Sequence, residues 1–107
     1  MRPSQQQLDE LVRRIVDAVH PLRIILFGSA ARGEMGEDSD VDVMVVMPEG
    51  VNQHQTAGHL YMQFRGLGFP VDVLVATTAQ IDRYADDIGF IYYDVLREGK
   101  DIYVAAA

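Results

Sequence analysis

The sequence predicts a single α/β (α+β) domain over residues 1–107, in which a small mixed β-sheet is packed against helices. Residues 22–27, 40–47 and 71–76 are short apolar runs rich in Val, Ile or Leu, which favours buried strands. Segments with apolar residues at helical spacing alternate with these runs, which is typical of helices layered on a sheet. The length suits one domain and leaves little room for a second.

Each helix is predicted from apolar periodicity and from residues that favour helix ends. Ser4 and Gln7 match a capping box, and apolar residues follow at helical spacing, so a helix is expected over 4–19. Pro21 ends it. The remaining expected elements are a helical turn that becomes a loop over 30–36, a helix over 52–66, a short helix over 78–84 capped by Thr78, an amphipathic helix over 88–96 closed by Gly99, and a last strand over 101–104.

The composition excludes several classes of protein. A formal net charge of −7 argues against a direct nucleic-acid binder, because that binding relies on Lys and Arg neutralising phosphates. It is compatible with a nucleotide bound through a metal ion. The absence of cysteine excludes disulfides and thiolate zinc sites. With a polar start and no apolar run of the ~18 residues that span a bilayer, a cytoplasmic protein with no membrane partner is expected.

Acidic residues stand inside two of the predicted strands. Asp40 and Asp42 are two positions apart within 40–47, and alternate side chains of a strand point to one face. Asp72 lies inside the apolar run 71–76, where a charge is costly unless it is paired or bound to metal. If the two strands are neighbours, the three carboxylates converge.

Electrostatic repulsion decides what such a convergence requires. Two unit charges ~5 Å apart repel by about 3 kcal/mol at an effective dielectric constant of ~20. Three such pairs would approach ~10 kcal/mol, which is comparable with the stability of a small domain. The acids must therefore keep protons or bind cations. Mg²⁺ prefers oxygen ligands, and two such ions ~3.5–4 Å apart stabilise both the attacking and the leaving oxygen of a displacement at phosphorus.

A Gly-Ser turn follows the first predicted strand. Backbone N–H groups at a helix start attract phosphate, Gly28 allows close approach, and the Ser29 hydroxyl is able to donate to a phosphate oxygen. Arg32 either serves the substrate or forms a salt bridge with an acid within 34–38; the sequence favours neither. Together these residues predict a phosphate site beside a metal site.

The whole motif resembles a known signature. The spacing Gly-Ser-x-x-Arg-Gly-x(5)-Ser-Asp-x-Asp, from Gly28 to Asp42, is similar to that of the DNA polymerase beta-type nucleotidyltransferase superfamily and of its small prokaryotic branch, the minimal nucleotidyltransferases. The complete pattern is specific, whereas a bare Gly-Ser or Asp-x-Asp is weak. Val71-Asp72-Val73 fits the third acidic strand, and the likeness spans about residues 8–104.

The resemblance implies roles for these residues. Asp40 and Asp42 would bind Mg²⁺, with a two-metal site expected, and Asp72 would complete the site and act as base or acceptor-side ligand. The implied reaction moves a nucleoside monophosphate, with AMP from ATP expected, onto an acceptor hydroxyl. The nucleotide-binding candidates are Gly28, Ser29, Arg32 and Ser39.

The resemblance also implies a protein partner. Minimal nucleotidyltransferases often pair with a small helical HEPN-type toxin and are thought to silence it by adding AMP. Tyr84, Tyr92 and Tyr93 are expected to be exposed and are candidates for such an interface. In the alternative hypothesis, the chain is a non-catalytic antitoxin that neutralises its partner by docking. A small-molecule nucleotidyltransferase ranks lower, because the chain lacks the length for an added acceptor domain.

Simpler interpretations accompany these hypotheses. Asp40 and Asp42 fit a solvated strand end, and Asp72 fits a solvated edge acid. The acids from residue 38 onward partly match an EF-hand loop, but Val43 stands where glycine is required. The three histidines show no metal-ligand spacing, and the methionines at 44, 47 and 62 are expected in the core.

Overall fold

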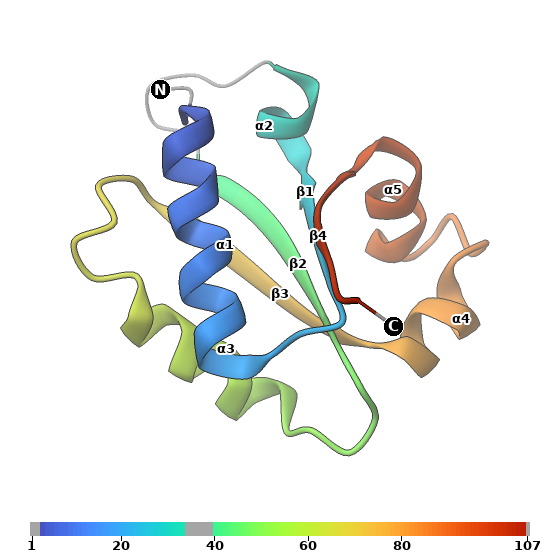
Figure 1. Cartoon of the computed structure of the whole chain (residues 1–107). Helices are drawn as coiled ribbons and strands as arrows, with labels where there is room; N and C mark the ends of the chain where they lie inside the picture. The colour runs from blue at the N-terminus through green and yellow to red at the C-terminus, as the bar shows by residue number, and fades with distance from the viewer. Residues whose placement is uncertain (1–2, 34–39, 107) are drawn as a thin grey trace.

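The computed structural model of the chain describes residues 3–33 and 40–106, and it confirms the predicted mixed α/β fold (Figure 1). The elements match the expected ones to within a few residues at each end. In chain order they are α1 (Gln5–Val19), β1 (Arg23–Phe27), α2 (Gly28–Arg32), β2 (Val41–Met47), α3 (Gln53–Gln63), β3 (Val71–Thr77), α4 (Thr78–Tyr84), α5 (Ile91–Glu98) and β4 (Lys100–Val104).

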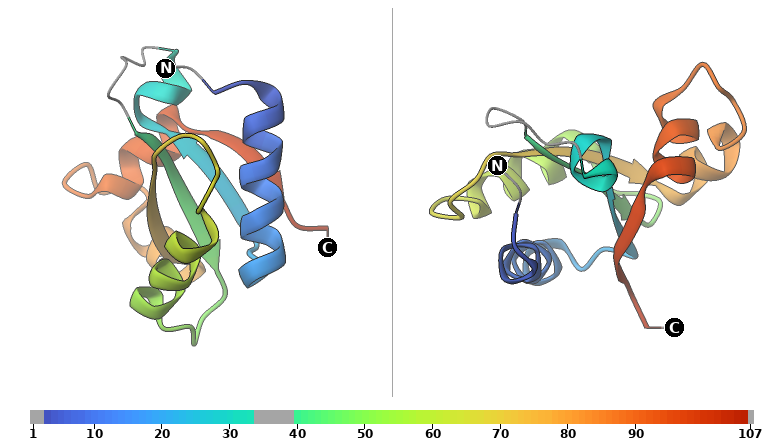
Figure 2. Two further views of the ribbon diagram at one scale, coloured as in Figure 1. Left: turned by 90° about the vertical axis from the view of Figure 1, so that its left-hand side faces the viewer. Right: turned by 90° about the horizontal axis from the view of Figure 1, so that it is seen from above.

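The four strands form one mixed sheet in the order β3-β2-β1-β4. β1 lies at the centre and is antiparallel to both β2 and β4. β2 and β3 are parallel, because the connection between them contains α3. α1 and the α4–α5 pair lie on opposite sides of this sheet (Figure 2).

Each face of the sheet buries alternate residues of its strands. On one face, Val43 and Val45 pack with Leu11 and Ile15 of α1 and Leu60 of α3 in the larger core. On the other face, a smaller core forms against α4 and α5; its buried members are Ile25, Met44, Val46, Ala76 and Val95. The sheet therefore separates a broad apolar layer from a narrower one.

The predicted helix ends are correct in part. Ser4 and Gln7 form the expected capping box at the start of α1. At α4 the cap is Thr77 and not Thr78, because the Thr77 side chain accepts the backbone N–H of Gln80. Gly99 follows α5 as expected but is extended, with φ −71°, so left-handed backbone does not explain it. A Cβ at that position would collide with the Val95 carbonyl and with Ile25, so close packing demands glycine.

Two other expectations from the sequence are wrong in detail. The helix predicted to begin near residue 88 begins at Ile91, which leaves Ile88 outside it and 75% exposed. Met62 is exposed on α3, unlike the buried Met44 and Met47. Residues 41–47 form a continuous strand, which rules out an EF-hand loop there. Within the described residues, no helix is both long and apolar enough to cross a membrane.

Candidate functional site

Two of the predicted acids stand side by side at one end of the sheet. Because β2 and β3 are parallel and in register, Asp42 lies directly opposite Asp72. Both project to the α4–α5 face, since each lies two positions before a residue of the smaller core, Met44 or Leu74. Asp40 comes just before β2 and is exposed. The structure therefore brings Asp42 and Asp72 together and places Asp40 at their margin.

The environment of Asp42 disfavours its charge. Its carboxyl pKa is raised above 3.8, first by burial and then by the negative charges of Asp72 and Asp40. The positive charge of Arg32 acts in the opposite direction. Since all three acids and Arg32 influence one carboxyl group, they belong to one electrostatic cluster. A cation placed there would relieve the repulsion.

Gly28 lies against this carboxylate. It follows β1 directly and has φ +69°, a left-handed conformation that favours glycine. A Cβ built on it would come 2.5 Å from Asp42 Oδ2, closer than any side chain tolerates. Glycine is thus favoured for its backbone angle, and any larger residue would have to displace the Asp42 carboxylate. This explains why the Gly-Ser turn and Asp42 occur together in the motif.

The other nucleotide-binding candidates lie around α2. Ser29 is half-buried in its first turn. Arg32 ends that helix and forms an ion pair with Glu98 of α5, at 3.2 Å between its Nη1 and the Glu98 Oε2. The salt-bridge alternative from the sequence named acids in 34–38 as partners; those residues and Ser39 lie outside the described ranges.

Tyr61 belongs to the site, although the sequence predicted it only as one residue of the helix over 52–66. Its hydroxyl donates a hydrogen bond to Asp72 Oδ1 at 2.8 Å and accepts one from the Val73 N–H at 2.9 Å. Burial raises the pKa of Tyr61 above 10.0, and the nearby Asp72 adds to this, so the hydroxyl keeps its proton. No spacing rule connects position 61 with position 72, so no sequence pattern predicts this contact.

A hollow of about 340 Å³ opens over the acid pair. Its lining is formed by Phe27, Asp42, Asp72, Val73, Leu74 and Ile91. It combines two acids with apolar walls, a mixture typical of ligand-binding pockets. Ile91 and the neighbouring Phe90 are exposed, so an apolar surface continues from the hollow onto the start of α5.

The tyrosines expected to be exposed are instead half-buried. Tyr84 stacks on Phe90, with ring centroids 4.3 Å apart, and on Tyr92, at 6.0 Å. Tyr93 lies under the guanidinium of Arg97. The stack joins α4 to α5, so the apolar surface beside the site is carried by Phe90 and its neighbours and not by the tyrosines.

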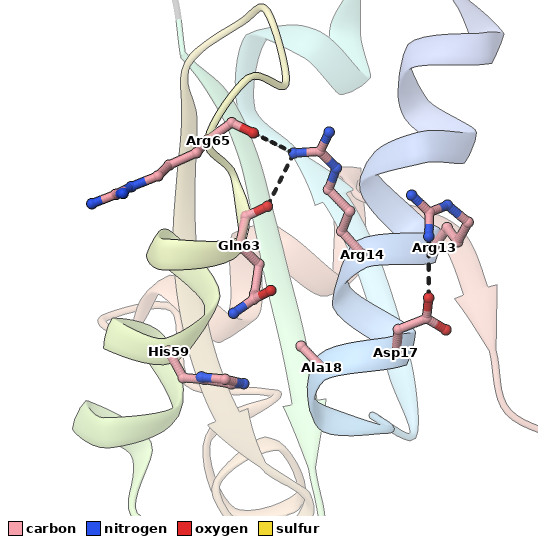
Figure 3. Close-up of a pocket in the computed structure, with 7 residues that line it drawn as sticks. All are labelled: Arg13, Arg14, Asp17, Ala18, His59, Gln63 and Arg65. Carbon is pink, nitrogen blue, oxygen red and sulfur yellow. Dashed lines mark hydrogen bonds and ion pairs between the residues drawn. The ribbon is translucent and has the colours of Figure 1, made fainter.

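A larger depression of about 560 Å³ lies between α1 and α3, away from the acids. It contains several cationic groups, but they do not converge (Figure 3). Arg13 pairs with Glu10 and Asp17, and Arg14 donates to the carbonyl oxygens of Gln63 and Arg65. These arginines tie α1 to itself and to the end of α3, so the depression offers no phosphate site comparable with the Gly-Ser turn.

The carboxylates of the acid pair fit a magnesium ion whose remaining ligands come from waters and a substrate. Across residues 3–33 and 40–106, no three acidic or histidine side chains are already arranged as a metal cage. Mg²⁺ seldom needs one, since it usually binds through one or two carboxylates together with waters and substrate phosphates. Asp42 and Asp72 supply such carboxylates, with Asp40 beside them.

Comparisons with known proteins identify the family and the fold of the chain. The family model described as a nucleotidyltransferase domain matches residues 7–101. A candidate nucleotidyltransferase from Sulfolobus solfataricus superposes with a TM-score of 0.63 at 22% identity, covering 92% of this chain and 78% of that one. Among curated proteins, none matches the chain.

Two toxin–antitoxin structures share the same fold. One is an MntA–HpeT pair with two Asp-to-Glu substitutions, with a TM-score of 0.60 at 17% identity. The other is a toxin–antitoxin structure with AMP-PNP, with a TM-score of 0.61 at 21% identity. In both cases 92% of this chain and 73% of the other are covered.

The mixed sheet, the acid pair and the Gly-Ser turn are the features that the sequence motif led us to expect of a nucleotidyltransferase. Because the family model covers most of the length, the chain belongs to the nucleotidyltransferase domain family. The likeness to the minimal nucleotidyltransferases inferred from the motif is confirmed at the level of family and fold.

Proposed function

We propose that this chain is a metal-dependent nucleotidyltransferase that transfers AMP from ATP to a hydroxyl of a partner protein, as the antitoxin of a toxin–antitoxin pair. The observation that carries the proposal is the register of Asp42 opposite Asp72, with Gly28 held against Asp42. The toxin–antitoxin neighbours support the kind of partner.

Each group of the chain has a role in the proposed transfer. Asp40 and Asp42 would hold Mg²⁺ with help from Asp72, and the bound metal offsets negative charge on the phosphates. The Gly28 backbone and the Ser29 hydroxyl bind the terminal phosphates. Asp72 accepts the proton of the acceptor hydroxyl. The acceptor oxygen then forms a bond to the α-phosphorus while the bond to pyrophosphate breaks, so AMP is transferred and pyrophosphate leaves.

A protein acceptor fits the surroundings better than a small molecule. Ile91 lines the hollow over the acids, and the exposed Phe90 and Ile88 extend the apolar surface outward. Exposed apolar side chains gathered in one place favour contact with another protein. The described residues of this chain form no second domain that could enclose an acceptor. The same surface favours the alternative function, in which the chain neutralises its partner by docking alone.

A labelling experiment tests the proposal. The chain is incubated with Mg²⁺ and α-³²P-labelled ATP, GTP, CTP or UTP, with and without a small helical protein of the proposed toxin type as partner. We expect label on that partner, strongest with ATP, and a loss of about 10³-fold or more in Asp42→Asn. Asp82→Asn, an exposed acid on α4, is the matched control and should label normally.

Two outcomes would contradict the proposal. Equal labelling by wild type and Asp42→Asn would place the chemistry elsewhere. The docking function would be established instead if the wild-type chain transferred no label, and if wild type and Asp42→Asn bound and inhibited the partner equally.

A further inference from the structure

We infer that Tyr61 is a positioning residue for Asp72: its hydroxyl fixes one carboxylate oxygen and leaves the other directed to the metal and acceptor. The inference rests on the proposed function for its catalytic meaning. The hydrogen bonds that carry it are properties of the chain itself.

The two hydrogen bonds give the hydroxyl a single orientation. A tyrosine hydroxyl has one proton to donate. The Val73 N–H donates to its oxygen, so the hydroxyl proton is free to point at Asp72 Oδ1. The backbone N–H of Val73 thus holds the Tyr61 hydroxyl, and that hydroxyl in turn holds the carboxylate of Asp72. This short chain of hydrogen bonds runs from the backbone to the acid.

The contact is possible because β3 is an edge strand. Tyr61 belongs to α3, on the face of the larger core, whereas Asp72 projects to the α4–α5 face. A side chain from α3 therefore reaches Asp72 only by passing around the outer edge of the sheet. The Tyr61 ring does this and packs edge-on against Phe64, with centroids 6.1 Å apart.

Asp72 needs such a partner more than Asp42 does. Asp42 is half-buried between the sheet and Gly28, so its surroundings restrict it. Asp72 is exposed on the outermost strand and would otherwise change rotamer freely. Outer hydrogen-bond partners that orient a ligating carboxylate typically change metal affinity by about 10-fold or more. The hydrogen bond from Tyr61 thus restricts the orientation of the Asp72 carboxylate, as burial restricts that of the Asp42 carboxylate.

A purely structural role is the competing explanation, since the same edge has another side-chain cap. Gln53, also from α3, donates from Nε2 to the Val75 carbonyl at 2.8 Å. Gln53 also exchanges hydrogen bonds with Gln80, and it touches neither acid of the pair. Gln53→Met is therefore the control for Tyr61→Phe. Both substitutions remove a side-chain hydrogen bond to the backbone of the β3 edge, and only Tyr61→Phe removes a hydrogen bond to Asp72.

The first measurement needs neither metal nor nucleotide. In the ¹³C-labelled whole chain, Tyr61→Phe should shift the Asp72 carboxyl resonance, while Gln53→Met should leave it unchanged.

In manganese titrations followed by electron paramagnetic resonance, Tyr61→Phe should weaken Mn²⁺ binding by about 10-fold. The double variant Tyr61→Phe/Asp72→Asn should bind Mn²⁺ no more weakly than Asp72→Asn alone. In the labelling reaction, kcat should fall by about 10-fold with little change in KM for ATP.

The outcomes separate this inference from the proposed function. An unchanged Asp72 resonance in Tyr61→Phe, or an equal effect of Gln53→Met, overturns the positioning role whether or not the chain transfers nucleotide. Multiplicative loss of Mn²⁺ affinity in the double variant also overturns it, because Tyr61 would then act independently of Asp72. If the Asp72 resonance shifts in Tyr61→Phe but not in Gln53→Met, the positioning role is supported. If the wild-type chain at the same time transfers no label, the proposed function is contradicted while the positioning role stands.

Discussion

The two faces of the sheet differ in what they bury. The face under α1 and α3 forms the larger core, with Leu11, Ile15 and Leu60 fully enclosed. The face under α4 and α5 has a smaller core, and at the start of β2 and β3 it gives way to Asp42 and Asp72. One face therefore contributes most of the apolar burial, and the other carries the site.

This division lets a small domain tolerate an unfavourable acid pair. Carboxylates placed side by side lower stability, and a domain of this size has only about 5–15 kcal/mol in total. Apolar burial on the opposite face offsets that cost without occupying the space that a ligand needs. Substitutions on the two faces should therefore separate stability from activity.

The largest expected effect compares two leucines. Leu60 on α3 is fully buried in the larger core, whereas Leu96 on α5 is only partly buried beside the smaller one. Leu60→Ala should lower the free energy of unfolding by about 2–5 kcal/mol, because it leaves a cavity. Leu96→Ala should cost about 1 kcal/mol. Urea unfolding monitored by circular dichroism measures both, and equal losses would show that the two faces stabilise the fold equally.

The second comparison uses two glycines with positive φ. Gly28 has φ +69° and Asp42 beside it, whereas Gly50 has φ +93° and open space around it. Alanine at either position should cost about 1–2 kcal/mol through backbone strain. Only Gly28→Ala should also displace the Asp42 carboxylate, lowering nucleotidyl transfer by about 100-fold or more. If Gly50→Ala reduced the transfer as strongly, strain and not the contact with Asp42 would explain the loss.

The sequence predicted the elements of the site better than its contacts. The sequence predicted that the acids would converge if their strands were neighbours; β2 and β3 are adjacent and bring Asp42 opposite Asp72, whereas Asp40 lies just before β2. Local chemistry also predicted the Ser4 cap and the Gly-Ser turn. Such features depend on residues close together in the chain, so short-range rules suffice for them.

Contacts between distant elements could not be predicted. Arg32 pairs with Glu98, 66 positions away, because α2 and α5 meet across the sheet end. The bond from Tyr61 to Asp72 depends on β3 being the edge strand, which only the strand order reveals. Gly99 was predicted for its backbone freedom and is needed for packing space. The described ranges exclude Ser39, so its role stays a prediction.

The smallest expected effect contrasts the pH dependence of one acid on each face. The pKa of Asp42 is raised above 3.8, chiefly by burial, so its ionisation opposes folding. The pKa of Glu10 on α1 is lowered from 4.5 to about 2, chiefly by its hydrogen bonds with Arg13 and Arg14. The Asp42 contribution to stability is thus present below pH 3.8 and is lost as pH rises through its raised pKa. The Glu10 contribution is present above pH 4.5 and is lost as pH falls through about 2.

Neutral substitutions should therefore have opposite effects at pH 7. Asp42→Asn should raise the free energy of unfolding, by about 1 kcal/mol or less because solvent screens a partly exposed charge, and the gain should vanish below pH 3.8. Glu10→Gln should lower it, with the loss disappearing as pH approaches 2. Urea midpoints between pH 7 and pH 2.5 measure both trends. A destabilised Asp42→Asn at pH 7 would mean that Asp42 serves the fold, and the separation of stability from activity between the two faces would fail at its central residue.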